Sequence, residues 1–323
     1  MIATKDSNGL YLRVSVTDRC QLRCSYCMPK EGIEQCSHKD ILNYEEIVSF
    51  VRAVQQHYHL RKVRITGGDP LVRPNIETLI AMLSDAGIPD IAITTNGQLL
   101  TRRARQLKNS GLHRVSVSLD SLCELTFRDL NGGSLEKTLE GIESAIRLGL
   151  TPLKLNMVVL RGINDAEVGD IADFALARGC EVRFLELMPI GYGASRFEDW
   201  YVSSEEVRRR LSQSYTLSPL PVNRGETSCT YSIEGNRGRS GTVGFISPYS
   251  HPFCDGCRRL RLTADGNLLG CLASEKGVSV RNILRSDDPA AANQIGAIVA
   301  GALKGKPTCR TFKRRDSMAA IGG

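Results

Sequence analysis

Residues 11–27 read YLRVSVTDRCQLRCSYC, a β-branched apolar run that ends in three closely spaced cysteines. Cys20, Cys24 and Cys27 have the spacing Cys-x3-Cys-x2-Cys. Their three thiolates are one fewer than a tetrahedral zinc site or a fully capped [4Fe–4S] cube requires. Closely spaced thiolates are typical of iron–sulfur ligation, so the spacing predicts a [4Fe–4S] cluster with one iron open to a ligand that is not protein.

A second group of three cysteines, Cys254, Cys257 and Cys271, lies far downstream. The same count predicts a second open cluster, so that two clusters face a shared chemistry. A structural zinc site is the alternative for the first group, with His38 as its fourth ligand. We expect no disulfides, because residues 1–8 form no apolar leader and the cysteines are too sparse for a cysteine-stapled domain.

The composition is that of a globular protein: 323 residues, 41% hydrophobic and 24% charged. We expect a cytoplasmic location, because eleven cysteines without a leader indicate a reducing compartment. No apolar run approaches the roughly 18 residues of a membrane span, so no membrane partner is expected. The net charge of +7 favours a small, highly charged anion. Nucleic acid is not expected, because aromatic residues make up only 6% and no arginine-rich helix carries them.

The first part of the chain alternates apolar β-like runs with amphipathic stretches. The expected strands are Leu12–Val16, Val63–Thr66, Ile91–Thr95, Val115–Leu119, Leu153–Val159 and Val182–Leu187. Six such alternations imply a parallel sheet with right-handed crossovers. An eight-unit barrel usually takes about 250 residues, so we expect an α/β fold with an incomplete (β/α)6 TIM-type barrel over residues 1–190. A doubly wound open sheet is the competing fold.

Three helices are predicted from their first residues and apolar stripes. Asn43 can cap a helix that carries Ile47, Val51 and Val54 on one face. Ser134 can cap a second helix, and a third is expected to begin at Asp165. Polar clusters follow five of the six strands: residues 17–20, 67–70, 94–97, 118–120 and 186–189. In parallel α/β folds ligands bind at this edge, so the sequence predicts the site there.

Residues 191–323 have a different texture, rich in glycine, serine and arginine, and are predicted to form a smaller region that binds the second cluster and closes the barrel mouth. Thr263–Asn267 predicts a hairpin turn between Arg259–Leu262 and Leu268–Leu272. Arg259 and Arg261 alternate along one strand and therefore share one face. The composition of the closing residues, 319–323, favours a frayed end.

Taken together, these motifs resemble the radical S-adenosylmethionine (SAM) superfamily, whose signature is Cys-x3-Cys-x2-Cys with an aromatic residue before the last cysteine, here Tyr26. The chain resembles more narrowly the GTP 3′,8-cyclase family of molybdenum cofactor biosynthesis. The matching stretches are residues 12–20, 62–68, 94–97, 117–120, 154–156, 183–188, 253–266 and 322–323. Three residues depart from the family pattern: Asp69 for Glu, Gln21 for Asn and Arg258 for Asn.

The resemblance implies two [4Fe–4S] clusters, SAM, and a radical cyclisation of GTP. The first cluster would bind the methionine part of SAM, the 5′-deoxyadenosyl radical would take the 3′ hydrogen of GTP, and C3′ would attack guanine C8. The second cluster would hold the guanine. By resemblance the SAM contacts are Tyr26, Gly68, Ser118 and Met188, and the GTP contacts are Arg13, Arg64, Thr94, Lys154, Arg259, Leu260 and Arg261. Gly322–Gly323 would thread into the barrel mouth.

The resemblance also implies partners. These are a reductant of the flavodoxin or ferredoxin type and, downstream in the pathway, cyclic pyranopterin monophosphate synthase; a homodimer is a further expectation. Two other functions are weighed. A radical SAM enzyme acting on a peptide would be expected to carry a longer cysteine-rich extension. A nonenzymatic iron–sulfur or zinc module for nucleic acid would leave residues 67–70 without a role.

Overall fold

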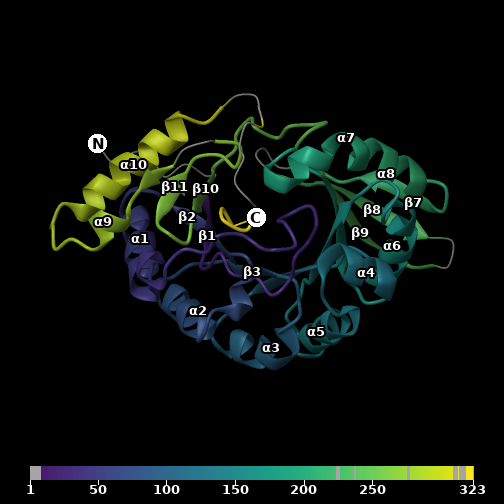
Figure 1. The fold of residues 1–323 in the computed structure, drawn as a ribbon, viewed down its shortest axis with the longest axis horizontal. Coiled ribbons are helices and arrows are strands. Elements are labelled where there is room, and N and C mark those ends of the chain that lie inside the picture. Colours follow the sequence, from purple (N-terminus) through teal and green to yellow (C-terminus); the bar gives the residue numbers. More distant parts are fainter. Residues whose placement is uncertain are drawn as a thin grey trace.

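Six parallel strands follow one another in sequence and in space. They are β1 (Leu10–Ser15), β2 (Leu60–Thr66), β3 (Ile91–Thr95), β4 (Arg114–Ser118), β5 (Lys154–Val159) and β6 (Glu181–Glu186). The computed structural model describes residues 9–222, 226–235, 238–274, 277–307, 312 and 318–322. All six predicted strands are confirmed, with bounds that differ by a few residues at either end. Figure 1 shows the strands surrounded by helices, as in an incomplete barrel rather than a doubly wound sheet.

The helices that follow the strands cover the outside of the sheet (Figure 1). They are α1 (Tyr44–His57), α2 (Ile76–Asp85), α3 (Leu100–Asn109), α4 (Glu124–Asn131), α5 (Leu135–Arg147) and α6 (Val168–Leu176). Asn43 and Glu46 form a complete capping box at the start of α1, and the Ser134 side chain accepts from the backbone of Lys137 at the start of α5. Both predicted caps are thereby confirmed. The third helix begins at Val168, because Asp165–Glu167 form a 3-10 turn first.

Alternation along the strands separates two environments. Apolar residues such as Val14, Ile65 and Leu155 are fully buried in the core between sheet and helices. The intervening positions face the barrel interior and are largely polar or charged. The inner face of the sheet is therefore the surface on which charged ligands could be held.

The C-terminal part of the chain extends the same sheet at both edges. At one edge β10 (Arg259–Leu262) pairs parallel with β1 and is followed by β11 (Asn267–Leu269) and β12 (Val278–Ser279). At the other edge β9 (Ser240–Ile246) pairs parallel with β6 and is followed by β8 (Cys229–Gly235) and β7 (Tyr215–Pro219). The β10–β11 hairpin confirms the prediction, whereas β7 to β9 were not predicted. The domain division at residue 190 stays a prediction.

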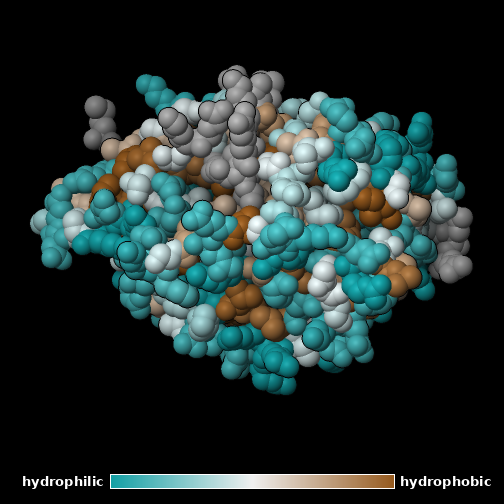
Figure 2. Space-filling view, viewed as in Figure 1, coloured by the Kyte–Doolittle hydropathy of each residue, from teal (hydrophilic) through white to brown (hydrophobic). Residues whose placement is uncertain are grey.

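The remaining helices are α7 (Phe197–Trp200), α8 (Ser204–Leu211), α9 (Arg281–Leu284) and α10 (Ala291–Lys304). Helix α10 packs on α1, and Figure 2 shows apolar residues where α10 lies. Residues 318–322 return to the centre of the ring (Figure 1). In the ranges given above, no helix has the length and apolar character needed to cross a bilayer.

Candidate active site

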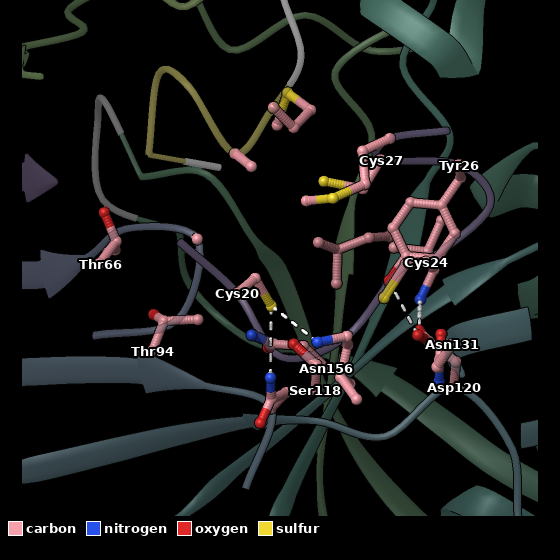
Figure 3. Close-up of a pocket in the computed structure, with 18 of the residues that line it drawn as sticks. Cys20, Cys24, Tyr26, Cys27, Thr66, Thr94, Ser118, Asp120, Asn131 and Asn156 are labelled. Atoms are coloured by element: carbon pink, nitrogen blue, oxygen red, sulfur yellow. Dashed lines mark hydrogen bonds between the residues drawn. The ribbon is translucent and has the colours of Figure 1, made fainter. Parts of the chain in front are cut away.

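The first cysteine group lies on the loop after β1. Cys20, Cys24 and Cys27 line one pocket, together with residues from the carboxyl ends of several strands (Figure 3). The loop is held in a tight turn, since the backbone N–H of Cys27 donates to the carbonyl of Cys24 at 2.8 Å. The Cys20 sulfur accepts from the Leu22 N–H at 3.4 Å and from Asn96 Nδ2 at 3.6 Å. His38 is exposed and does not line this pocket.

These thiols fit a positively charged metal cluster. Burial, with Asp69 and Cys27 adding to it, raises the pKa of the Cys20 thiol to about 11. Burial also raises the pKa of Cys24 well above its usual range. Metal ligation requires thiolates, and the iron charge of a cluster would offset this penalty. Among the described residues, no three His, Cys, Asp or Glu side chains are arranged to hold a single metal ion.

Two glycines after β2 allow this loop to pack against the cysteine loop. A Cβ on Gly67 would lie 2.6 Å from the Thr17 carbonyl, and one on Gly68 would lie 2.3 Å from the Arg19 carbonyl. Both distances are shorter than any real contact, so only glycine fits. The backbone N–H of Gly68 donates to Thr17, and that of Asp69 donates to Arg19, at 2.7 and 2.8 Å.

Asp69 braces the end of β3. Its carboxylate accepts from the Leu71 N–H at 2.9 Å, the Thr95 hydroxyl at 2.7 Å and the Asn96 N–H at 2.7 Å. Burial raises the pKa of Asp69, while these hydrogen bonds oppose the rise. Asp69, whose side chain is shorter than the Glu of the family pattern, is thus already hydrogen-bonded to other groups of the protein.

Tyr26 is fixed at the pocket wall by a buried carboxylate. Its hydroxyl donates to Asp120 Oδ2 at 2.8 Å, and Asp120 Oδ1 accepts from the Val158 N–H at 2.9 Å. Burial raises the pKa of Asp120 to about 6. Ser118 lies on the same strand end and also lines the pocket (Figure 3). The sequence named Tyr26 and Ser118, and the structure brings both to the first cysteine group.

A group of cations lines the inner face of the barrel. Arg13 on β1 has two neighbours in register, Arg64 on β2 and Arg261 on β10. Arg64 donates to the hydroxyls of Thr94 and Ser116 at 3.0 and 2.8 Å. Burial, together with the neighbouring arginines, lowers the pKa of Arg13 to about 10 and that of Arg261 well below its usual range. Positive charge crowded in this way favours a polyanionic ligand.

Three buried polar atoms in the same pocket have no hydrogen-bond partner among the residues that the structure describes. They are Nε of Arg13, Oδ1 of Asn131 and Oδ1 of Asn156. Buried polar groups are normally paired, and each unpaired one needs an explanation. A bound ligand with both acceptors and donors would satisfy them.

Tyr11, Lys62 and Arg183 belong to the same interior face and were missed by sequence reasoning. The Tyr11 hydroxyl accepts from Arg64 Nε at 2.7 Å. Burial acts to raise the pKa of Tyr11, but Arg64 and the other surrounding cations lower it to about 8. Alternation along the strands was the signal for Tyr11 and Lys62, which lie two positions from Arg13 on β1 and Arg64 on β2. Arg183 on β6 is instead the register neighbour of Asn156, two positions from Lys154 on β5.

Lys154 and Leu260 differ from the other predicted GTP contacts. Lys154 pairs with Glu181, which also accepts from Arg183 at 2.5 Å. Burial, followed by the charge of Arg183, lowers the pKa of Lys154 to about 8. The Leu260 side chain is buried in the hydrophobic core, so only its backbone remains for a ligand.

Met188 lines the pocket and also packs against a small apolar cluster with Ile190 and Ile321. The predicted contact with SAM and the alternative packing role therefore both remain compatible with its position.

The second cysteine group lies at the start of β10 and after β11. The N–H of Cys257 donates to the carbonyl of Cys254 at 3.1 Å. Nη1 of Arg259 lies 3.7 Å from the Cys257 sulfur. Lys306 Nζ lies 3.7 Å from the Cys257 sulfur and 2.5 Å from the carbonyl of Gly270, the residue before Cys271, so the segments of these two thiols lie next to each other. The predicted hairpin therefore does bring distant thiols together.

The C-terminal tail enters the barrel mouth. Ala319 and Ile321 are buried. Arg261 Nη1 donates to the Gly322 carbonyl at 2.7 Å. Gly322 has φ +73° and a Cβ there would lie 2.7 Å from Cβ of Ser15, so glycine is required. The frayed end favoured by composition is wrong for Gly322, and Gly323 lies outside the described residues.

Family models match both parts of the chain. The Radical SAM superfamily model matches residues 14–175, and a model described as Molybdenum Cofactor Synthesis C matches residues 180–312.

Curated relatives are similar over almost their whole length. The GTP 3′,8-cyclases of Alkaliphilus metalliredigens and Alkaliphilus oremlandii are 41% and 44% identical to this chain over 97% of each protein. The enzyme of the same name from Geobacter sulfurreducens is 41% identical over 97% of this chain and 96% of its own.

A solved structure supports the fold alone. Streptococcus suis SuiB bound to S-adenosylmethionine has a TM-score of 0.60 at 16% identity, covering 90% of this chain and 68% of SuiB.

Proposed function

The chain belongs to the GTP 3′,8-cyclase family of radical SAM enzymes, and from this premise we propose how its residues act. The reaction is the cyclisation of GTP to (8S)-3′,8-cyclo-7,8-dihydroguanosine 5′-triphosphate, the first step of molybdenum cofactor biosynthesis. The peptide alternative is not retained, because the curated relatives named above are GTP 3′,8-cyclases.

One observation supports this assignment most strongly. A single pocket is lined by the three thiols of the first cysteine group and by the half-buried cations Arg13 and Arg261. Thiols for a radical-generating cluster and charge for a triphosphate thus share one space. A metal centre without a polyanionic substrate would leave these cations unexplained.

Cys20, Cys24 and Cys27 would hold the first [4Fe–4S] cluster. When bound, that cluster and SAM supply the 5′-deoxyadenosyl radical that abstracts hydrogen from the substrate. The side of the pocket formed by Tyr26, Gly68, Ser118 and Met188 would bind SAM. Because Asp69 is engaged by Thr95 and Asn96, we assign the methionine amino group to backbone acceptors near Gly68.

Arg13, Arg64, Thr94, Lys154, Arg259 and Arg261 would bind the GTP phosphates, with Leu260 contributing only its backbone. Guanidinium groups match phosphate oxygens in geometry and retain their charge. Cys254, Cys257 and Cys271 would hold the second [4Fe–4S] cluster, whose open iron would bind the guanine. With the phosphates bound at one end of GTP and the guanine at the other, the ribose between them would have its C3′ near the SAM side of the pocket.

The cellular setting is also part of the proposal. The enzyme would act in the cytoplasm, receive electrons from a reduced flavodoxin or ferredoxin and pass its product to cyclic pyranopterin monophosphate synthase. A homodimer is the expected assembly.

The test is an anaerobic incubation of reconstituted protein with SAM, dithionite and GTP. We expect 5′-deoxyadenosine together with the cyclised nucleotide, and roughly eight irons per chain from two cubes. Formation of 5′-deoxyadenosine without any cyclised nucleotide would mean that the substrate has been misassigned.

A further inference from the structure

Lys306, two residues beyond α10, contacts the second cysteine group. Its Nζ lies 3.7 Å from the Cys257 sulfur, 2.6 Å from the Arg259 carbonyl and 2.5 Å from the Gly270 carbonyl. A lysine ammonium has three protons to donate, and these three acceptors match them in number.

The three acceptors come from two separate segments that carry the thiols. Cys257 and Arg259 lie at the start of β10. Gly270 follows β11 and directly precedes Cys271. One ammonium therefore ties the segment of Cys254 and Cys257 to the segment of Cys271.

The close approach of Gly270 to α10 makes this bridge possible. A Cβ on Gly270 would lie 2.4 Å from the Ala302 carbonyl, a distance that only glycine avoids. On its other side, α10 is seated on α1, where a Cβ on Gly296 would lie 2.5 Å from the His57 ring. The position of Lys306 is thus fixed by packing between elements rather than by a flexible loop alone.

We propose that Lys306 is a positioning residue for the second iron–sulfur cluster: it holds the two thiol segments together and raises the reduction potential of the cluster through its charged hydrogen bond to Cys257. This inference rests on the proposed function, because it requires a cluster on Cys254, Cys257 and Cys271.

The physical reason is that positive charge and hydrogen bonds directed at cluster sulfurs stabilise the reduced, more negative state. Arg259 also contacts the Cys257 sulfur, but Arg259 is itself one of the proposed phosphate contacts. Lys306 comes from the segment after α10 and donates to two backbone carbonyls. Its substitution can therefore change the cluster without removing a substrate contact.

The experiment isolates the second cluster in full-length protein in which Cys20, Cys24 and Cys27 are replaced by alanine. In this background Lys306→Gln, Lys306→Arg and the control Lys304→Gln are compared; Lys304 is the exposed lysine at the end of α10. Iron and sulfide content, the midpoint potential followed by electron paramagnetic resonance, and thermal stability with and without the cluster are measured.

We expect Lys306→Gln to lower the ratio of reduced to oxidised cluster about tenfold at a fixed potential, which is about 59 mV for one electron. Lys306→Arg should retain the parental potential, because it keeps the charge, and Lys304→Gln should match the parent. The loss of thermal stability caused by Lys306→Gln should be larger in the cluster-bound protein than in the cluster-free protein.

A Lys306→Gln protein with parental potential and iron content would overturn the proposal. So would equal destabilisation with and without the cluster, or failure to fold even without iron, since the residue would then support the fold alone. Absence of any cluster in the background protein with Lys306 intact would be a different result, because it would overturn the proposed function of the second cysteine group.

Discussion

Arg261 on β10 donates a hydrogen bond from Nη1 to the carbonyl of Gly322 at 2.7 Å, across 61 residues of chain. The same arginine lies in register with Arg13 and lines the pocket shared with the first cysteine group. The tail is therefore part of the pocket wall and is held by a residue that is also proposed to bind phosphate.

Deleting Gly322 and Gly323 tests the tail. We expect thermal stability and both clusters to be retained, because glycine buries no side chain and its ordering is costly. Cleavage of SAM should continue, whereas formation of the cyclised product should fall sharply. Undiminished product formation, measured by chromatography of anaerobic reactions, would show that the tail only occupies the mouth.

Cys24→Ala should abolish cleavage of SAM, because the radical requires a cluster on the first cysteine group. Iron content should fall from roughly eight to roughly four per chain. The matched control is Cys123→Ala, since Cys123 is an exposed thiol outside both groups. Persistent 5′-deoxyadenosine from purified Cys24→Ala protein would remove this group from the catalytic site.

Cys257→Ala should have the opposite pattern. The first cluster should still form and SAM should still be cleaved, while conversion of GTP is lost because the guanine has no anchor. Parental turnover of GTP by this variant would leave the second cysteine group with a structural role only.

Arg259→Ala should weaken GTP binding by about 1.5–3 kcal/mol, the loss of a charge-assisted hydrogen bond, or roughly 10- to 150-fold in Kd. Arg261→Ala should lose at least as much, because it also releases Gly322. Guanosine, which has no phosphates, should be affected much less, and Arg102→Ala on the exposed face of α3 serves as control. Equal losses for GTP and guanosine would assign these arginines to the fold.

Tyr11 predicts a pH dependence of GTP binding. The pKa of its phenol lies at about 8 because the surrounding cations outweigh burial. This value lies below the pKa of about 10 in the unfolded chain. Ionisation of Tyr11 therefore adds to the stability of the folded protein as pH rises from about 8 to about 10. The contribution is lost as pH falls through 8. The phenolate would compete with phosphate for Arg64, so affinity for GTP should decline above pH 8.

The measurement is titration calorimetry with GTP between pH 7 and pH 9. Tyr11→Phe removes the ionisable hydroxyl but keeps the ring, and its affinity should not show this decline. A decline of equal size in both proteins would assign the pH dependence to another group.

The sequence alone predicted the parts of the molecule that repeat. The six barrel strands were recognisable because their core-facing positions carry β-branched and aliphatic residues, such as Ile91 and Ile93 on β3, which are fully buried under the helices. The caps at Asn43 and Ser134 were recognisable because the capping residues are local. Polar residues at the strand ends also located the pocket correctly.

Other features depend on contacts between distant segments. Strand β7 is largely exposed and β8 is mostly half-buried, so both lack the apolar pattern of a buried strand. Lys306 has no local motif, and its role depends on how α10 meets β11. The partners of Asp69 likewise come from β3 and its following loop, 26 and 27 residues away.

The parallel pairing of β10 with β1 has a consequence for folding. Tyr11 and Arg259 are neighbours in the sheet although they come from distant parts of the chain. Contacts of such high sequence separation form late, because the entropy of closing the loop must be overcome first. During synthesis β1 would leave the ribosome long before its partner and present an unpaired edge. Chaperone protection of this edge is thus expected to determine how much of the newly made protein reaches the native state.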